Sequence, residues 1–362
     1  MSANAPNIRE LRVRAVRVPM QEPHRTASGT ISESPLVLTD VVTDEGLVGH
    51  SYVFCYSALA LKPTALLVKG LEPLLVGQPV APLAIEQMLA ARFRLLGAQG
   101  LTGIAMAAID MALWDALARA QAVPLARLLG ATLKPVPAYG ATGYDGPEGS
   151  ARVAAQWAER GFKGVKAKIG YPDVRDDLAV VRAMRRAVGD GVALMVDYNQ
   201  SLTPVDAIER ARRLDDEGLT WIEEPTLAED FEGHARVARE VKTPIQAGEN
   251  WWGPHEMRKA IAAGACDFVM PDVMKIGGVT GWMRAAALAE AHGIRLSNHL
   301  FVEVSTQLLC ATPTAHWLEY AEWFNPVIAQ PIRIVDGCAV PEDRPGSGIE
   351  WNEGAVRRYL VE

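Results

Sequence analysis

From residue 136 onward the chain alternates short apolar runs with longer segments of helical periodicity. In each longer segment the apolar residues recur three or four positions apart, as on one face of a helix. The predicted strands are residues 136–139, 164–169, 193–197, 220–223, 244–247, 268–271, 295–297 and 317–319. The predicted helices between them are residues 147–160, 175–188, 204–217, 229–241, 254–263, 279–292 and 304–311. Eight strands alternating with seven helices are typical of a parallel β/α barrel.

The first third of the chain has a different order of elements. Residues 8–18 alternate as an edge strand, and residues 36–43 and 47–54 flank a turn at Asp44-Glu45-Gly46, which indicates a hairpin. Residues 21–34 are polar and rich in turn formers, so we expect a mobile loop there. Residues 58–75, 82–95 and 103–121 are predicted helices. Strands followed by helices indicate an α+β domain.

The end of the chain returns to turns and short strands, at residues 332–335 and 346–348, without a regular eighth helix. We expect this segment to pack back onto the first domain. The predicted fold class is therefore α/β: a modified TIM-type (β/α)7β barrel with an N-terminal α+β capping domain completed by the C-terminal segment. The corresponding ranges are 1–133 for the capping (lid) domain, 134–330 for the barrel and 331–362 for the C-terminal segment.

Composition excludes several classes of protein. The 362 residues are 49% hydrophobic and 22% charged with both signs mixed, which is typical of a folded globular enzyme and not of a disordered chain. A net charge of -7 argues against a nucleic-acid or anionic-membrane partner. The four cysteines are scattered and suggest reduced thiols. The most apolar helix contains Asp110 and Asp115, so we expect no membrane-spanning segment and a cytoplasmic location.

Three acids follow three successive predicted strands at one interval. Asp197, Glu223 and Glu249 are each 26 residues apart, which is the length of one strand-plus-helix unit. They should therefore emerge at equivalent ends of neighbouring strands and converge at the barrel mouth. Converging carboxylates repel one another unless a cation lies between them, and hard oxygen ligands favour Mg²⁺. The alternative is that each acid caps a helix or pairs with a surface cation.

Other ionisable residues fall at the same end of the barrel. Lys166 and Lys168 are two apart on one strand, so both side chains point into the mouth. His299 follows the seventh strand, and Asp272, after the sixth, could hold one ring nitrogen and leave the other as a base. A satisfied core histidine is the alternative for His299.

This set of groups suits removal of a proton next to a carboxylate. The product of that step is a dianion, which Mg²⁺ and a lysine ammonium can neutralise as it forms. We expect Lys166 and the metal to lower the pKa of Lys168 so that it can act as a base, while His299 needs little adjustment. A base on each face of the substrate would permit removal from one side and return from the other, which is racemisation.

Several runs of the chain resemble the mandelate racemase subgroup of the enolase superfamily, and the resemblance covers essentially the whole length. They are residues 165–172, 195–202, 221–226, 274–282, 299–301 and 311–319. The resemblance implies one Mg²⁺ per subunit, bound by Asp197, Glu223 and Glu249, and a small carboxylate substrate. It also implies a homo-oligomer.

The resemblance implies further roles for individual residues. Lys166 would neutralise the substrate carboxylate, Lys168 and His299 would be the two bases, Asp272 would orient His299, and Glu319 would donate a hydrogen bond to the carboxylate. The substrate-binding set it implies is Asn199, Lys275, His24, Arg25, Tyr56, Ala141 and Leu300. Lys275 is expected behind the His299–Asp272 pair.

The chain departs from the subgroup pattern at two places. The pattern has a serine at the end of the first barrel strand, where this chain has Ala141 with Thr142 beside it. In the lid, small apolar residues are replaced by His24, Arg25 and Ser28. A lid able to carry positive charge is expected to favour a more polar substrate.

Three functions therefore stay open. A racemase of a 2-hydroxy acid needs both bases, which are present. A dehydratase of a sugar acid (an aldonate or aldarate) would use the same enolate and expel a β-hydroxyl with protonated His299 as general acid. A barrel that binds a ligand without turnover is disfavoured, because unused clustered charges would cost stability.

Overall fold

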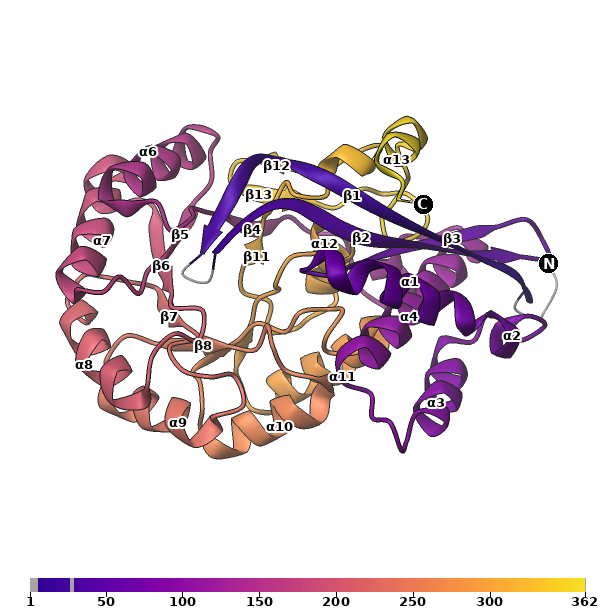
Figure 1. Cartoon of the computed structure of the whole chain (residues 1–362), viewed down its shortest axis with the longest axis horizontal. Coiled ribbons are helices and arrows are strands. Elements are labelled where there is room, and N and C mark those ends of the chain that lie inside the picture. The colour runs from indigo at the N-terminus through magenta and orange to yellow at the C-terminus, as the bar shows by residue number, and fades with distance from the viewer. Residues whose placement is uncertain (1–5, 27–28, 362) are drawn as a thin grey trace.

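The predicted barrel is present in the computed structural model, which describes residues 6–26 and 29–361 (Figure 1). Its eight parallel strands are β4 (Val136–Ala141), β5 (Gly164–Lys168), β6 (Ala193–Asp197), β7 (Trp221–Glu223), β8 (Ile245–Ala247), β9 (Phe268–Val269), β10 (Arg295–Leu296) and β11 (Leu318–Glu319). Each strand from β4 to β9 pairs with the next, and β11 pairs with β4. An isolated parallel bridge connects Leu296, at the end of β10, with Ala315, three residues before β11.

Seven helices surround these strands, as the alternation predicted. They are α6 (Gly146–Glu159), α7 (Val174–Val188), α8 (Pro204–Leu214), α9 (Phe231–Glu240), α10 (Gly253–Ala263), α11 (Gly278–Ala291) and α12 (Val302–Cys310). Several begin where the sequence signals a start: Thr203 accepts a hydrogen bond from the Asp206 N–H, and Pro204 occupies the first turn of α8. The strands are buried on both faces, which explains their apolar runs.

The capping domain has three antiparallel strands and a helical layer. The strands are β1 (Ile8–Thr26), β2 (Gly29–Thr43) and β3 (Val48–Phe54), in the order β1-β2-β3. The helices are α1 (Ala58–Gly70), α2 (Glu72–Leu75), α3 (Pro82–Arg92), α4 (Gly100–Ala120) and the short α5 (Leu125–Leu128). The predicted helix 58–75 is divided in two, because Gly70 ends α1 and Pro73 lies in the first turn of α2.

The expectation of a loop at residues 21–34 is wrong. The strands of the hairpin continue through this region, with His24 paired to Ile31 and Arg25 to Thr30 after a register shift that follows Pro19. Antiparallel pairing uses backbone groups, so polar side chains do not prevent it. We name the part of this hairpin at residues 19–26 and 29–33 the lid; Figure 1 shows it reaching from the cap across the barrel towards α6 and β5.

Helix α4 is the apolar core of the cap. It packs against β3, α1 and the barrel helix α11. By length and composition it is the one helix in the described residues that could span a membrane, so the sequence-based exclusion of any such segment was too strong. In this structure 83% of the qualifying window is buried inside the protein, and Asp110 accepts hydrogen bonds from the N–H and hydroxyl of Thr280.

The C-terminal segment contacts both domains. Strands β12 (Arg333–Val335) and β13 (Cys338–Val340) form a hairpin, and β13 pairs antiparallel with β4 of the barrel. Helix α13 (Glu353–Tyr359), which the sequence analysis missed, packs on β1. Residues 346–348 were predicted as a strand, but Gly346 makes only an isolated bridge with Pro124.

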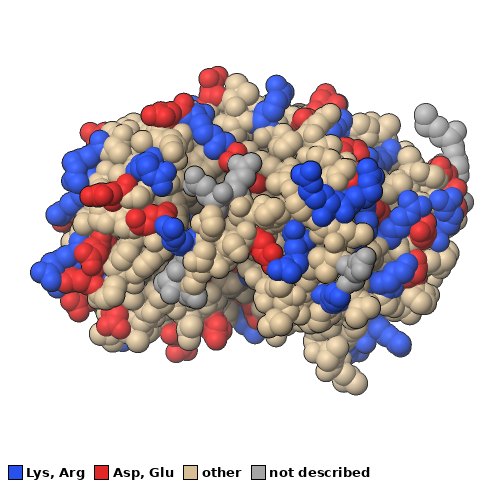
Figure 2. Space-filling view, turned by 45° about the horizontal axis from the view of Figure 1, so that its top comes forward, with Lys and Arg blue, Asp and Glu red and all other residues tan. Residues whose placement is uncertain are grey.

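Packing of this segment on the cap is confirmed by side-chain contacts. The indole N–H of Trp351 donates to Asp40 at 2.6 Å, and Arg14 forms an ion pair with Glu353 at 2.8 Å. Basic and acidic side chains are interspersed on the face shown in Figure 2, as the mixed composition predicts.

Candidate active site

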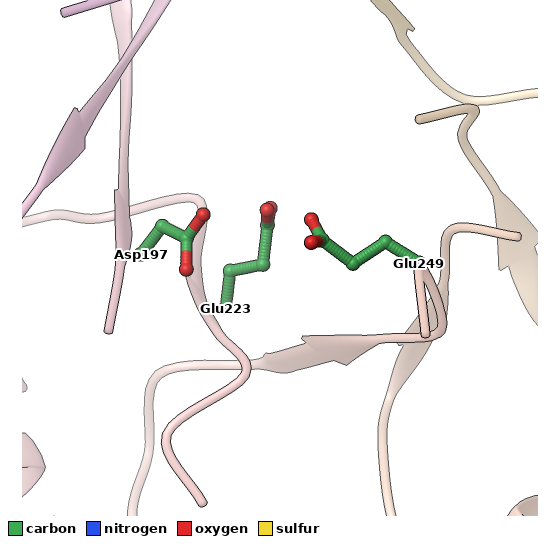
Figure 3. Close-up of side chains that lie close together, drawn as sticks. All are labelled: Asp197, Glu223 and Glu249. Atoms are coloured by element: carbon green, nitrogen blue, oxygen red, sulfur yellow. The ribbon is translucent and has the colours of Figure 1, made fainter. Parts of the chain in front are cut away.

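Three carboxylates meet at the ends of successive barrel strands. Asp197 ends β6, Glu223 ends β7, and Glu249 lies two residues beyond β8. One oxygen of each lies within 4.8 Å of the others, and all three side chains are buried. Figure 3 shows them pointing towards a common centre. The equal sequence spacing therefore predicted a real cluster.

The three acids fit a divalent cation. The Oε2 atom of Glu249 is buried and has no hydrogen-bond partner among the described residues. Burial raises the pKa of Glu223 to about 8, and the neighbouring Asp197 and Glu319 add to the rise against the opposing effect of Lys166. A bound cation would give Glu249 Oε2 a partner and would reduce the repulsion among the three carboxylates. A donor set made of carboxylates favours Mg²⁺.

Lys166 lies beneath this cluster as a buried ammonium. Its Nζ contacts Glu223, lies 2.8 Å from Glu319 Oε1, and is 3.7 Å from Asp197 Oδ2. Burial alone would lower the pKa of Lys166, but Glu223 and Glu319 outweigh it and hold the pKa well above its ordinary value. Lys166 is therefore a fixed positive charge.

Lys168 ends β5 and forms an ion pair with Asp197 Oδ2 at 2.5 Å. Burial and Lys166 lower the pKa of Lys168, as expected of the neighbouring lysine, but Asp197 outweighs them and raises it. The expectation of a lowered pKa also relied on a bound cation, so it stays a prediction. The sequence analysis considered the neighbouring lysine and not the acid opposite it.

His299 is held by Asp272 as predicted. The two residues make a backbone bridge, and His299 Nδ1 lies 2.7 Å from Asp272 Oδ2. Asp272 Oδ1 accepts from the backbone N–H groups of Met274 and Lys275, so the carboxylate is fixed. The Nε2 atom faces Glu249 at 3.5 Å and Glu319 at 4.0 Å. Burial lowers the pKa of His299, but Glu249 and Asp272 outweigh it and raise the pKa.

Glu319 has a partner at each carboxylate oxygen, and its role as a hydrogen-bond donor to a substrate carboxylate stays a prediction. One carboxylate oxygen pairs with Lys166, and the other accepts from the backbone N–H of Leu300 at 3.2 Å. Burial raises the pKa of Glu319, but Lys166 outweighs it and brings the pKa to about 2. Leu300 and Phe301 have φ of 47° and 50°, a strained conformation that aims the Leu300 N–H at this acid.

Asn199 and Lys275 lie beside the acids. Asn199 donates to Asp197 from its backbone N–H at 2.7 Å and from its side chain at 3.2 Å. Lys275 lies behind the His299–Asp272 pair as predicted, donating its backbone N–H to Asp272 and its ammonium to Asn250 at 2.6 Å. The Lys275 Nζ also lies 4.6 Å from the ring centroid of Tyr56. Tyr56 therefore packs on Lys275.

Sequence reasoning did not assign a role to the two residues that complete this network. Asn250 donates to Glu224 at 2.7 Å and to Glu249 at 3.3 Å, and Glu224 is fully buried. Burial and Glu249 raise the pKa of Glu224 well above its ordinary value. Each follows a metal-site acid directly, and that adjacency was the available signal.

A cavity of about 470 Å³ lies between the lid, α6 and the segment after β11. Its inner lining includes Lys168, His299, Glu319, Ala141 and Leu300. Trp157 donates its indole N–H to the Ala141 carbonyl, which holds the end of β4. Thr142 is buried, and its hydroxyl contacts the Gly143 carbonyl and not the cavity.

Two described residues of the lid, His24 and Arg25, line the cavity. The ring of His24 packs 4.8 Å from that of Trp323, and burial, with Lys168 nearby, lowers the pKa of His24 to about 3. Arg25 is 64% exposed and forms an ion pair with Asp145 at 3.3 Å. Tertiary contacts therefore keep His24 neutral and pair Arg25 with Asp145, and the expectation that a cationic lid favours a polar substrate stays a prediction. Ser28 lies outside the described residues.

Comparison with known proteins gives two family models that together span most of the chain. The model described as "Mandelate racemase / muconate lactonizing enzyme, N-terminal domain" matches residues 8–130, and the one described as "Enolase C-terminal domain-like" matches residues 149–355. The two matches meet near the start of the barrel.

Named relatives carry out several reactions. An L-talarate/galactarate dehydratase of Salmonella typhimurium is 37% identical over 265 residues, covering 72% of this chain and 67% of the relative. A 3,6-anhydro-alpha-L-galactonate cycloisomerase of Streptomyces coelicolor is 31% identical, covering 98% and 99%. A crystal structure of an enolase from Bradyrhizobium, complexed with magnesium and mandelic acid, is 44% identical with a TM-score of 0.96, covering all of both chains. An L-talarate dehydratase from Polaromonas, complexed with Mg and L-glucarate, is 30% identical with a TM-score of 0.92, covering 99% and 98%.

Proposed function

Because the chain belongs to the mandelate racemase / muconate lactonizing enzyme family of the enolase superfamily, we propose that it removes the α-proton of a 2-hydroxy carboxylate with the help of Mg²⁺ and returns it on the opposite face. One observation carries the proposal: Lys168 and His299 reach the same cavity from different strands, one beside Asp197 and the other beside Glu249. Two potential bases flank the acid cluster, and racemisation requires two.

The cation would be held by Asp197, Glu223 and Glu249, one per subunit, and similar proteins are crystallised with magnesium. A bound Mg²⁺ would supply positive charge that stabilises the charge developing on the substrate carboxylate and that offsets the negative charge of Asp197 beside Lys168. Asn199 fixes the orientation of Asp197 through its two hydrogen bonds.

Lys166 and Glu319 would receive the substrate carboxylate. Lys166 is positioned by its contacts with Glu223 and Glu319 and offers a permanent charge in a buried site. Glu319 takes up a proton when a second negative charge comes to lie beside it, because like charges raise the pKa of a carboxyl group. It would then donate to a substrate oxygen.

The two bases are prepared in different ways. Asp272 accepts from Nδ1–H of His299, so Nε2 is the atom that faces the cavity and exchanges a proton with the substrate. Lys168 becomes a base once Asp197 no longer raises its pKa, because the largest contribution that opposes burial and Lys166 is then removed.

The inner lining of the cavity favours an apolar or aromatic substituent at the reacting carbon. Ala141, Leu300 and Trp323 contribute apolar surface, and His24 is neutral and packs on Trp323. This chemistry agrees with the mandelic acid bound by the Bradyrhizobium relative.

A second candidate is dehydration of a sugar acid by the same bases. The outer part of the cavity is lined by Arg152, Gln156 and Arg160 of α6, which could receive hydroxyl or carboxylate groups of a longer substrate. The dehydratases among the relatives support this alternative. In that reaction His299, once protonated, would donate its proton to the departing β-hydroxyl.

One experiment separates the candidates. The purified enzyme is incubated in D₂O with Mg²⁺ and, in separate reactions, with each antipode of mandelate and with galactarate, which is achiral. Deuterium at the α-carbon of both antipodes supports racemisation. A 2-keto-3-deoxy acid from galactarate supports dehydration, and neither product from a wider panel of 2-hydroxy and sugar acids would contradict both.

The molecular partners follow the same proposal. We propose a small carboxylate substrate, a cytoplasmic location and no nucleic-acid or membrane partner. A homo-oligomer is supported by exposed leucines of the cap, among them Leu59, Leu95 and Leu96. Light scattering of the purified protein tests the oligomer.

A further inference from the structure

A pair of stacked tyrosines connects the lid to the strand end that carries Lys168. Tyr144 follows β4, and Tyr171 follows β5 three residues after Lys168. Their rings lie 3.9 Å apart at 17°. Neither residue is needed to bind the cation or to transfer a proton, so their arrangement calls for another role.

On one side, Tyr144 contacts the lid. Its backbone N–H donates to the carbonyl of Arg25 at 2.9 Å, and the Arg25 guanidinium pairs with the neighbouring Asp145. The Asp145 carboxylate in turn accepts from the Gly143 N–H at 2.9 Å. The loop after β4 is therefore the part of the barrel that receives the lid at this point.

On the other side, Tyr171 belongs to a segment that is tightly fixed. The backbone N–H groups of Gly170 and Tyr171 both donate to Asp177 Oδ1 at 2.9 Å. Asp177 is fully buried, and its Oδ2 accepts from Arg210 at 2.8 Å and from Tyr198 at 3.2 Å. One carboxylate thus holds the residues two and three positions after Lys168 and the tyrosine that directly follows Asp197.

The two sides are connected by the tyrosines and by the hydrogen bonds next to them. Tyr144 O–H donates to the Gly170 carbonyl at 3.4 Å, and Tyr171 Oη accepts from the Gly146 N–H at 2.8 Å. Gly170 has φ of 107°, and a Cβ there would lie 3.0 Å from Ser201 Oγ, so this backbone cannot easily shift.

We propose that Tyr171 is a positioning residue that couples the closed lid to the placement of Lys168. This inference rests on the proposed function, because it assigns Lys168 to one face of the substrate. Placement on that face should then depend on the Tyr144–Tyr171 stack. His299, held by Asp272 on another strand, should not depend on it.

The test is α-proton exchange in D₂O, measured separately for each antipode of mandelate, in three variants. Tyr171→Leu and Tyr144→Leu each remove the stack, whereas Tyr171→Phe keeps the ring and is the matched control. The antipode served by Lys168 is identified as the one whose exchange is lost in Lys168→Ala. Both leucine variants should slow its exchange by roughly 10- to 100-fold, the usual cost of a small misplacement, while the His299 face stays within about twofold.

The double variant should be no slower than either single leucine variant, since the two rings form one contact. Tyr171→Phe should stay close to wild type. Equal slowing on both faces, or no slowing in either leucine variant, would overturn the inference. Retained exchange at the His299 face also shows that the variants are folded.

Amide hydrogen exchange gives a readout that does not need turnover. Tyr171→Leu should raise exchange in residues 19–26 and 142–146 and leave residues 231–263 unchanged. A uniform rise, or none, would contradict the coupling. If wild type exchanges no proton of mandelate, the proposed racemase activity fails, and the amide data alone then decide whether the tyrosines hold the lid.

Discussion

Different kinds of contact position the two halves of the active site. We call the strand-end residues of the barrel the floor and the lid residues His24 and Arg25 the roof. At the floor, Asp197, Glu223 and Lys168 project from strand ends whose register is set by backbone hydrogen bonds between neighbouring strands. At the roof, His24 and Arg25 lie on a hairpin whose side chains are directed by Trp323 and Asp145, which are distant in sequence. The chemistry therefore follows from local chain geometry, whereas substrate selection follows from packing between domains.

The largest effect should come from the acids of the floor. Glu223→Gln removes one of three converging charges and leaves Lys166 with less compensation, so we expect activity to fall by roughly 10³- to 10⁵-fold. Calorimetric titration with Mg²⁺ should show weakened binding, and chelation of the wild type should abolish activity until Mg²⁺ is restored. Glu229→Gln, at an exposed acid, is the control. Unchanged Mg²⁺ affinity in Glu223→Gln would show that the cluster is not the cation site.

The next effect should divide the floor into its two faces. Lys168→Ala and His299→Asn should each abolish racemisation, with a loss of about 10²- to 10⁴-fold, while exchange from the opposite antipode persists. The measurement is α-deuterium incorporation into each antipode. Lys163→Ala, an exposed lysine just before β5, should have no effect. Racemisation that survives Lys168→Ala would rule out the two-base mechanism.

A smaller loss is expected from the residue that orients His299. Asp272→Asn should lower exchange at the His299 face by about 10- to 100-fold, because an amide can present its N–H and favour the wrong tautomer. Exchange at the Lys168 face should be kept. Equal losses on both faces would indicate that Asp272 supports the barrel in general and not the imidazole in particular.

At the roof the expected effects are small. Arg25→Ala breaks an exposed ion pair, so KM should rise by at most about fivefold with kcat unchanged. Arg186→Ala removes an exposed arginine of α7 and serves as the control. A loss of kcat in Arg25→Ala would mean that the guanidinium reaches the substrate and would reduce the contrast between roof and floor.

The smallest effect is expected from His24. Its pKa is lowered to about 3, so the imidazole stays neutral throughout the pH range above that value. The pH dependence of KM between about pH 5 and 9, a range that brackets the ordinary pKa of histidine, should therefore be the same in wild type and in His24→Gln. A limb near the ordinary value that disappears in His24→Gln would show that the lid does titrate.

The same contrast explains what the sequence could predict. Barrel strands and helices could be located because strands buried on both faces give apolar runs and helices give apolar residues three or four positions apart. Asp197, Glu223 and Glu249 were found by their equal spacing. The lid strands were missed because they pair through backbone atoms, and this pairing does not require an alternation of apolar and polar side chains. The pKa of Lys168 and the ionisation of Glu319 could not be worked out from spacing, because each depends on a partner from another strand. Asp177, Tyr171 and Tyr144 could not be connected from spacing alone.

The hairpin β12–β13 and the helix α13 affect how the chain folds. Strand β13 pairs with the start of β4 in the barrel, while α13 packs against β1 of the cap. The same C-terminal segment therefore contacts both domains. Residues 333–359 must therefore be synthesised before β4 can pair with β13 and before β1 can pack against α13. Shortening the chain before β12 should therefore leave both domains with exposed edges and an increased tendency to aggregate.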